Sequence, residues 1–191
     1  MQDEIIKNGS VRISYAEGVA GGQFFNPSVG NMSFNEVISE IRDYISAQPE
    51  FFYDIVVGCD SPSSDKPFFP IAIVVLRRGA GGRFFLKKMT YPDNELKRFT
   101  NVPTNWKQRI LQEVYLSCEL ALSLRETLEK EFGVSRPDFK YEFAYIHADV
   151  GEHGKTKEMV KEVTGLIKGH GFEPMIKPLS FAASVVADRY T

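Results

Sequence analysis

The sequence is poor in the residues that bind zinc or form disulfide frameworks. Its 191 residues include only two cysteines, Cys59 and Cys118, and three histidines. The cysteines lack the clustered spacing of a zinc site, and they are too few for the disulfide framework of a secreted domain. The sequence therefore predicts neither feature, and it favours the reducing environment of the cytoplasm.

The chain also lacks long apolar runs and a large excess of either charge. No stretch approaches the roughly 18 apolar residues of a membrane span, and Asp3, Glu4 and Lys7 stand where a signal peptide needs apolar residues. The 23 basic and 25 acidic side chains leave a formal charge of -2, so no global basic field attracts nucleic acid or acidic membranes. We expect a soluble, cytoplasmic protein without a membrane partner, in which a local site must hold any nucleic acid.

Apolar side chains are abundant, at 43% of the sequence, and aromatic ones reach 13%. This content can offset the entropy lost on folding, so we expect an ordered chain. Its length favours one domain over residues 1–191. Within it, we expect residues 1–32 to form an extended N-terminal arm packed by its aromatics, and residues 33–47 to add a helix.

The order of periodic segments predicts an α/β sandwich with a mixed sheet. Ser33 followed by Glu36 is typical of a capping box at the start of a helix. Short turns join the first three strands, so these strands are expected to pair antiparallel. The predicted elements are a helix at 33–47, strands at 55–58, 69–76 and 83–89, a long helix at 105–131, a strand at 141–148, a helix at 155–168, a strand at 172–177 and a helix at 180–188.

Two aspartates follow apolar strands. Asp60 ends the first strand and Asp149 ends the strand after the long helix, where an ionised carboxylate is costly without compensation. If these two strands pair in parallel, both carboxylates lie at the same edge of the sheet. Adjacent carboxylates repel, and a hard cation such as Mg²⁺ or Mn²⁺ removes that repulsion.

Three more acids are candidate ligands: Glu113 and Glu119 on the long helix, and Asp188 on the last helix. An all-carboxylate site favours Mg²⁺ or Mn²⁺ over zinc, and two such ions can support phosphodiester cleavage. Among 25 acidic residues, however, chance also places aspartates at strand ends, because Asp favours turns. The interpretation therefore depends on the combination of acids.

Four segments resemble the YkuK-type family, which is described as ribonuclease H-like. The resemblance extends from about Phe24 to the end of the chain, and the Asp149 segment followed by GKT at 154–156 is its most specific part. The segments are VGCDS at 57–61, QEVYLSCE at 112–119, IHADVG at 146–151 and AASVVADRYT at 182–191.

The resemblance implies a ribonuclease H-like three-layer fold whose mixed sheet has five strands, three antiparallel and then parallel ones, flanked by helices. It also implies metal-binding or catalytic roles for Asp60, a helix glutamate, Asp149 and Asp188. Glu113 is the first choice for the glutamate. Glu119 is a rival, because six residues along a helix turn a side chain to another face.

The loop at 151–156 superficially resembles a phosphate-binding loop, but only two residues separate its first glycine from GKT, whereas a P-loop has four. Nucleotide hydrolysis is therefore not the favoured function. Lys155 at a helix start is a candidate contact for a substrate phosphate, as are Ser61 and His153. His147 is expected to be structural, and His170 is expected to cap a helix end.

A basic hairpin offers a second place for nucleic acid. It interleaves aromatic residues with cations, a combination that can contact a backbone and stack bases. Edge strands carry the same cations to prevent aggregation, and the aromatics are expected to lie in the core. Trp106 near the helix start is expected to be a packing anchor rather than a stacking platform. The cations are Arg77, Arg78, Arg83, Lys87 and Lys88.

The leading hypothesis is a divalent-metal-dependent nuclease that cleaves nucleic acid phosphodiesters through a cluster of carboxylates. The alternative is a non-catalytic binding module that keeps the fold and recognises nucleic acid or a protein. Four retained acids favour the nuclease, because clustered negative charge does not help a module bind a polyanion.

Overall fold

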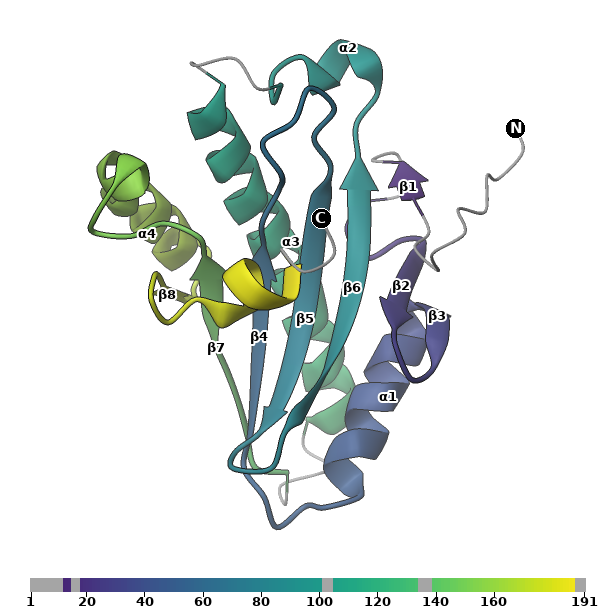
Figure 1. The fold of residues 1–191 in the computed structure, drawn as a ribbon. Helices are drawn as coiled ribbons and strands as arrows, with labels where there is room; N and C mark the ends of the chain where they lie inside the picture. The colour runs from purple at the N-terminus through teal and green to yellow at the C-terminus, as the bar shows by residue number, and fades with distance from the viewer. Residues whose placement is uncertain (1–11, 15–17, 101–104, 134–138, 188–191) are drawn as a thin grey trace.

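The computed structural model describes residues 12–14, 18–100, 105–133 and 139–187, and it shows one mixed sheet flanked by helices (Figure 1). Asp188 lies outside these residues. The strands are β1 (Arg12–Ser14), β2 (Gln23–Asn26), β3 (Gly30–Ser33), β4 (Tyr53–Cys59), β5 (Phe69–Arg77), β6 (Gly82–Thr90), β7 (Tyr141–Ala148) and β8 (Glu173–Met175). The helical elements are α1 (Phe34–Ser46), α2 (Asp93–Leu96), α3 (Trp106–Phe132), η2 (Lys155–Met159), α4 (Val160–Gly169) and η3 (Ala182–Ala187).

The sheet has eight strands in the described residues, so the expected number of five is wrong. Seven follow the order β3-β2-β6-β5-β4-β7-β8, and β1 pairs with β6 beside this path. The antiparallel pairs β4/β5 and β5/β6 and the parallel pairs β4/β7 and β7/β8 agree with the predicted mixture. The additional strands β1, β2 and β3 come from the N-terminal region.

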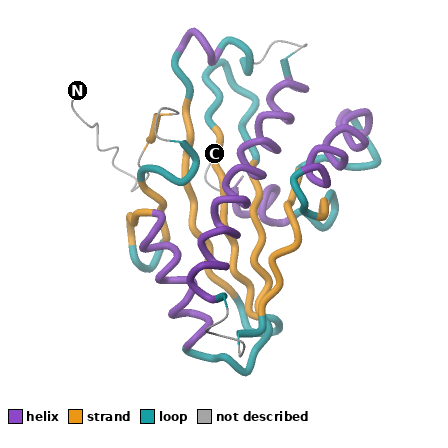
Figure 2. The backbone as a smooth tube through the Cα atoms, turned by 180° about the vertical axis from the view of Figure 1, so that it is seen from behind, coloured by secondary structure: helices purple, strands orange, loops and turns teal. Residues whose placement is uncertain are grey.

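Helices α1 and α3 lie together on one face of the sheet, as seen from behind in Figure 2, whereas η3 crosses the other face (Figure 1). Successive side chains of β4 point to opposite faces of the sheet, so this strand contributes to the packing on both faces. Ile55 and Val57 join the core beneath the helices, and Val56 packs with Ala182 and Ala187 of η3. No helix in the described part of the chain is long and apolar enough to cross a membrane.

Helix α1 begins as the sequence predicts. The N–H of Glu36 donates to the Ser33 hydroxyl, and the N–H of Ser33 donates to the Glu36 carboxylate at 2.6 Å, which completes the capping box. Val37, Ile38, Ile41 and Ile45 are buried at helical spacing. The local cap and the apolar stripe thus fix the same boundary.

The N-terminal region is more regular than the predicted arm. Strands β2 and β3 form an antiparallel hairpin, and β2 pairs with β6 through Phe25 and Leu86. Phe24 is fully buried, in agreement with packing by aromatics. The sequence did not reveal the hairpin because its pairing with β6 connects residues far apart in the chain.

Lys87 of β6 connects the residues that precede β2 to the sheet. Its side chain is only 1% exposed, and its ammonium group donates to the carbonyl oxygens of Gly18 and Val19, both at 2.8 Å, and of Gly21. An ammonium group has three N–H donors, and these carbonyls can accept all three. The desolvated charge is therefore compensated by backbone dipoles.

Other boundaries differ slightly from the predictions. The helix expected at 155–168 begins as the 3-10 helix η2 before α4, and the strand expected at 172–177 is limited to β8. The backbone leaves β8 before Lys177, whose N–H donates to the Val150 carbonyl at 2.9 Å. The last helical element, η3, is a π-helix.

We predict that Ser33→Ala lowers the free energy of unfolding by about 1 kcal/mol, because it removes the oxygen that caps α1. Urea denaturation at neutral pH measures this change. Ser46→Ala is the matched control, because Ser46 is exposed at the last residue of α1 and is expected to change the stability little. Equal effects of the two substitutions would contradict the role of the cap.

Candidate functional site

Asp60 and Asp149 follow neighbouring parallel strands. The register of β4 and β7 ends with Cys59 opposite Ala148, so the two aspartates are the next residues on adjacent strands. Alternation along the strands directs both side chains toward the face that η3 covers. The predicted juxtaposition of the two strand ends is therefore confirmed.

Glu113 approaches this strand end from α3. Its side chain is 6% exposed, and its carboxylate accepts from the N–H of Ser61 at 3.1 Å and from the Ser61 hydroxyl at 2.5 Å. Arg109, one turn earlier on α3, has its Nε 4.0 Å from the same carboxylate oxygen. The long helix thus places an acid next to the residue that follows Asp60.

The electrostatics link Glu113 to Asp60. Burial, and then the negative charge of Asp60, raise the pKa of Glu113 from its ordinary value of 4.5 to about 8, against the opposing effect of the Ser61 hydrogen bonds. Burial followed by the charges of Glu113 and Asp60 also raises the pKa of the Cys59 thiol. Burial and mutual repulsion therefore disfavour the ionised forms of Glu113 and Cys59 at the end of β4.

Asp149 forms an ion pair with a lysine of the same chain, Lys177. The Lys177 ammonium group lies 2.7 Å from its Oδ2, and the Asp149 side chain is 20% exposed. The other oxygen, Oδ1, is buried and accepts no hydrogen bond within the described residues. The Lys177 side chain lies against Gly151, where an added Cβ would come within 3.2 Å of it.

Lys177 was not among the residues that the sequence indicated. Nothing local marks it, because it reaches Asp149 only through the path of the chain after β8. Its N–H donates to Val150, which fixes this path beside the end of β7. The sequence signal was limited to a lysine at the end of the last predicted strand, at 172–177.

The structure separates the two helix glutamates. Glu119 is exposed, and six residues turn it roughly 120° around α3 from Glu113. Of the two, Glu113 is therefore the one that α3 brings to the end of β4, where the charge of Asp60 acts on it. Asp188 lies outside the described residues, although Ala187, immediately before it, packs against the face toward which both aspartates point.

The three predicted substrate contacts have different surroundings. Ser61 is buried and its hydroxyl is engaged by Glu113. His153 is exposed and lines a pocket of 390 Å³ together with Glu152, Lys157, Val160 and Lys161. Lys155 is exposed, and its ammonium group lies 4.8 Å from the centre of the Trp106 ring.

Other residues singled out in the sequence are engaged in the structure. The His147 Nδ1 accepts from the N–H of Ala182 at 3.0 Å, and burial lowers the pKa of His147 to about 4, as expected for a structural histidine. His170 caps α4 through Leu166. In the basic hairpin, Arg78 pairs with Asp54 and Glu142, Arg83 pairs with Glu40, and Lys87 is buried.

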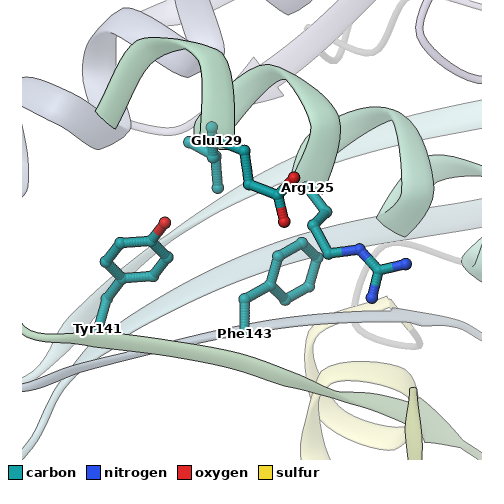
Figure 3. Close-up of a pocket in the computed structure, with 5 residues that line it drawn as sticks. Arg125, Glu129, Tyr141 and Phe143 are labelled. Carbon is teal, nitrogen blue, oxygen red and sulfur yellow. The ribbon is translucent and has the colours of Figure 1, made fainter. Parts of the chain in front are cut away.

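A second pocket lies far from the strand-end acids. It has a volume of 350 Å³ and is lined by Arg125, Leu128, Glu129, Tyr141 and Phe143. Figure 3 shows Arg125 and Glu129 of α3 facing the two aromatic side chains of β7. Tyr141 begins β7 whereas Asp149 follows its end, so this pocket and the acids occupy opposite ends of the strand.

A family model described as ribonuclease H-like matches residues 36–191, and the chain belongs to this family. Uncharacterized protein YkuK of Bacillus subtilis (strain 168) is 28% identical over 171 residues, which cover 88% of this chain and 96% of that protein. The resemblance to the YkuK-type family is thus confirmed. No solved structure matches the chain.

The mixed sheet with its flanking helices fits a ribonuclease H-like fold. Membership suggests a nuclease-like or nucleic-acid-binding function. In the part of the chain that the structure describes, no group of three or more histidine, cysteine or acidic side chains is arranged to hold a metal ion. Whether the protein cleaves nucleic acid or only binds it therefore depends on the chemistry of Asp60, Glu113 and Asp149.

We predict that the free energy of unfolding in EDTA contains a contribution from Glu113 that depends on pH. Its raised pKa means that this contribution is fully present below about pH 4.5 and is lost as the pH rises to about 8. Each unit of pKa difference corresponds to about 1.36 kcal/mol, so the total change is on the order of a few kcal/mol.

Glu113→Gln removes this titration, so the stability difference between wild type and variant must change across that range. Denaturant unfolding at a series of pH values measures it. Glu119→Gln is the matched control, because Glu119 is exposed on the same helix. Parallel curves for wild type and Glu113→Gln would contradict the burial of an ionisable carboxyl at this position.

Proposed function

We propose that the protein is a nuclease that cleaves nucleic acid phosphodiesters with the help of Mg²⁺ or Mn²⁺. The observation that carries the proposal is the position of Asp60 and Asp149 at adjacent strand ends, with Glu113 coupled to Asp60. Membership of the ribonuclease H-like family supports it. Asp188 remains a predicted fourth acid.

The acids have the donor chemistry that a divalent cation requires. Their ligands would all be oxygens, which Mg²⁺ and Mn²⁺ prefer. The Asp149 Oδ1 is buried without a donor in the described residues, and Glu113 is strongly desolvated. A cation would compensate both groups, provided that the Lys177 ammonium group yields its place at Asp149.

In this proposal Asp60, Asp149 and Glu113 would have to move together to hold the metal, since the described residues contain no group of three acids arranged as a metal site. The metal would supply positive charge for the cleaved phosphate. Ser61 orients Glu113 through two hydrogen bonds. Arg109 anchors the loop after Asp60, because its guanidinium donates to the Ser63 hydroxyl at 2.7 Å. Exposed His153 and Lys155, both on the segment that follows Asp149, would contact substrate phosphates.

A specific observation favours a second candidate, the non-catalytic binding module. Lys177 already supplies a cation to Asp149 at 2.7 Å, so part of the acidic cluster is neutralised by the chain itself. A module of this kind would bind nucleic acid without requiring a divalent metal. Metal-dependent cleavage separates the two functions.

We predict that the wild type cleaves at least one labelled substrate among single-stranded DNA, duplex DNA, RNA and RNA–DNA hybrid in Mn²⁺ or Mg²⁺. Asp149→Asn should lower the rate at least about a hundredfold, because it removes a charge from the proposed site without changing its size. Gel analysis of the products measures the effect.

The control for this experiment is Asp54→Asn. Asp54 lies near the start of β4, at the other end of the strand, and pairs with exposed Arg78. Equal cleavage by wild type and Asp149→Asn would point to another site or to a contaminant. Inactivity of the wild type on every substrate would favour the binding module.

We predict that Lys177→Gln binds Mn²⁺ about fivefold more tightly than the wild type, because it removes a cation that competes for Asp149. This factor corresponds to about 1 kcal/mol for one partly exposed ion pair. Calorimetric titration measures the affinity, and Lys168→Gln, which changes a more exposed lysine near Glu173, is the control. Weaker binding by Lys177→Gln would mean that the lysine orients Asp149 for the metal.

A further inference from the structure

A second cluster joins the first turn of α3 to η2. The Lys155 and Lys107 ammonium groups lie 4.8 Å and 5.6 Å from the centre of the Trp106 ring. Lys107 also pairs with Glu158 at 3.0 Å. The start of α3 and the start of η2 thus place two cations close to one aromatic ring.

The Trp106 cluster, formed by Trp106, Lys107 and Lys155, is connected to both strand ends. Arg109, three residues after Trp106 on α3, bonds to Ser63 in the loop after Asp60. Lys155 ends the loop after Asp149, which the bond from the N–H of Gly151 to the Thr156 hydroxyl closes at 3.2 Å. The Trp106 cluster is therefore linked to the loop after Asp60 through Arg109, and to the segment after Asp149 through Lys155.

The ammonium groups of the Trp106 cluster remain available to an anion. Lys155 is exposed and forms no ion pair with a carboxylate among the described residues. Lys107 and Glu158 are each about half exposed, at 47% and 56%, so their ion pair is weak and can exchange for a phosphate. Trp106 itself is only partly buried against the core.

Basic side chains continue from the Trp106 cluster onto the neighbouring surface. Lys157 and Lys161 are exposed, lie one turn apart and line the pocket that also contains His153. Glu152 is the acidic residue of that lining. Two lysines against one glutamate give this lining a local positive charge, whereas the whole chain has a net charge of -2.

We infer that the Trp106 cluster binds single-stranded nucleic acid, with a base stacked on Trp106 and adjacent phosphates at Lys155 and Lys107. Stacking on an aromatic side chain together with backbone contacts from cations is the usual means of binding unpaired strands without sequence preference. The inference rests on the proposed function, and it specifies that the substrate contains an unpaired segment next to the cleaved bond.

The test uses the fluorescence of Trp106, which is the only tryptophan in the chain. The full chain is titrated in EDTA and low salt with oligo(dT) and oligo(U) of about 12 nucleotides, within the usual size of such sites. Saturable quenching is expected. Lys155→Ala should lower the slope of log affinity against log salt by about 0.7.

Fluorescence anisotropy of a labelled oligonucleotide tests the variants of Trp106. Trp106→Leu should weaken binding roughly five- to a hundredfold, the range for loss of one stacked base, whereas Trp106→Phe retains most of the affinity. The matched control is Phe52→Leu, because exposed Phe52 also packs with a cation, Arg78 at 4.1 Å, but precedes the start of β4.

The inference is overturned by absent binding, by binding without quenching, or by a Trp106→Leu variant that binds as the wild type does. Equal affinity for the corresponding duplex, or equal quenching by poly-glutamate, also contradicts it. If the wild type shows metal-dependent cleavage but Trp106→Leu binds the oligonucleotide as the wild type does, only this inference is overturned. Stacking on Trp106 without metal-dependent cleavage would overturn the proposed function alone.

Discussion

The parallel pairing of β4 with β7 is the constraint on which the candidate site depends. Its register sets Cys59 opposite Ala148, and consequently Asp60 beside Asp149. A shift by one residue would direct one of the two side chains to the opposite face. The connection between these strands contains α3, which packs against β4 and carries Glu113 to the same end. The same connection thus places Glu113 at the sheet end that carries Asp60 and Asp149.

Glu113 and Asp149 differ in the groups that compensate their charge. Glu113 is buried and gains only the Ser61 hydrogen bonds and a distant Arg109, so its charged form is disfavoured. Asp149 has the Lys177 ammonium group in contact with one oxygen. Hydrophobic packing of β4 and β5 against α3 must therefore hold the strand end together against the cost of desolvated charge. A site of this kind is costly to the folded state, as expected where function and stability compete.

Local and periodic signals predicted much of this architecture. Ser33 and Glu36 fixed the start of α1, and the apolar runs gave β4, β5, β6 and β7 in their correct pairing. The pairing of the N-terminal region with the sheet was missed because it depends on residues of β6 that are distant in the sequence: Leu86 pairs with Phe25 of β2, and Lys87 bonds to Gly18 before β2. Helical spacing alone left Glu113 and Glu119 as rivals, since only tertiary packing decides which face of α3 meets the sheet. Lys177 depended in the same way on the path after β8.

The placement of acidic and basic side chains near the ends of β4 and β7 determines how strongly a polyanion is attracted there. A cluster of carboxylates repels a polyanion, so a nuclease needs cations close enough to offset that field within a Debye length of about 10 Å. The chain places two cations near the acids: Arg109 of α3 bonds to the loop after Asp60, and Lys155 begins η2 after Asp149. These cations therefore come both from α3 and from the segment that follows Asp149. The near-zero net charge of the protein conceals this local separation of opposite charges.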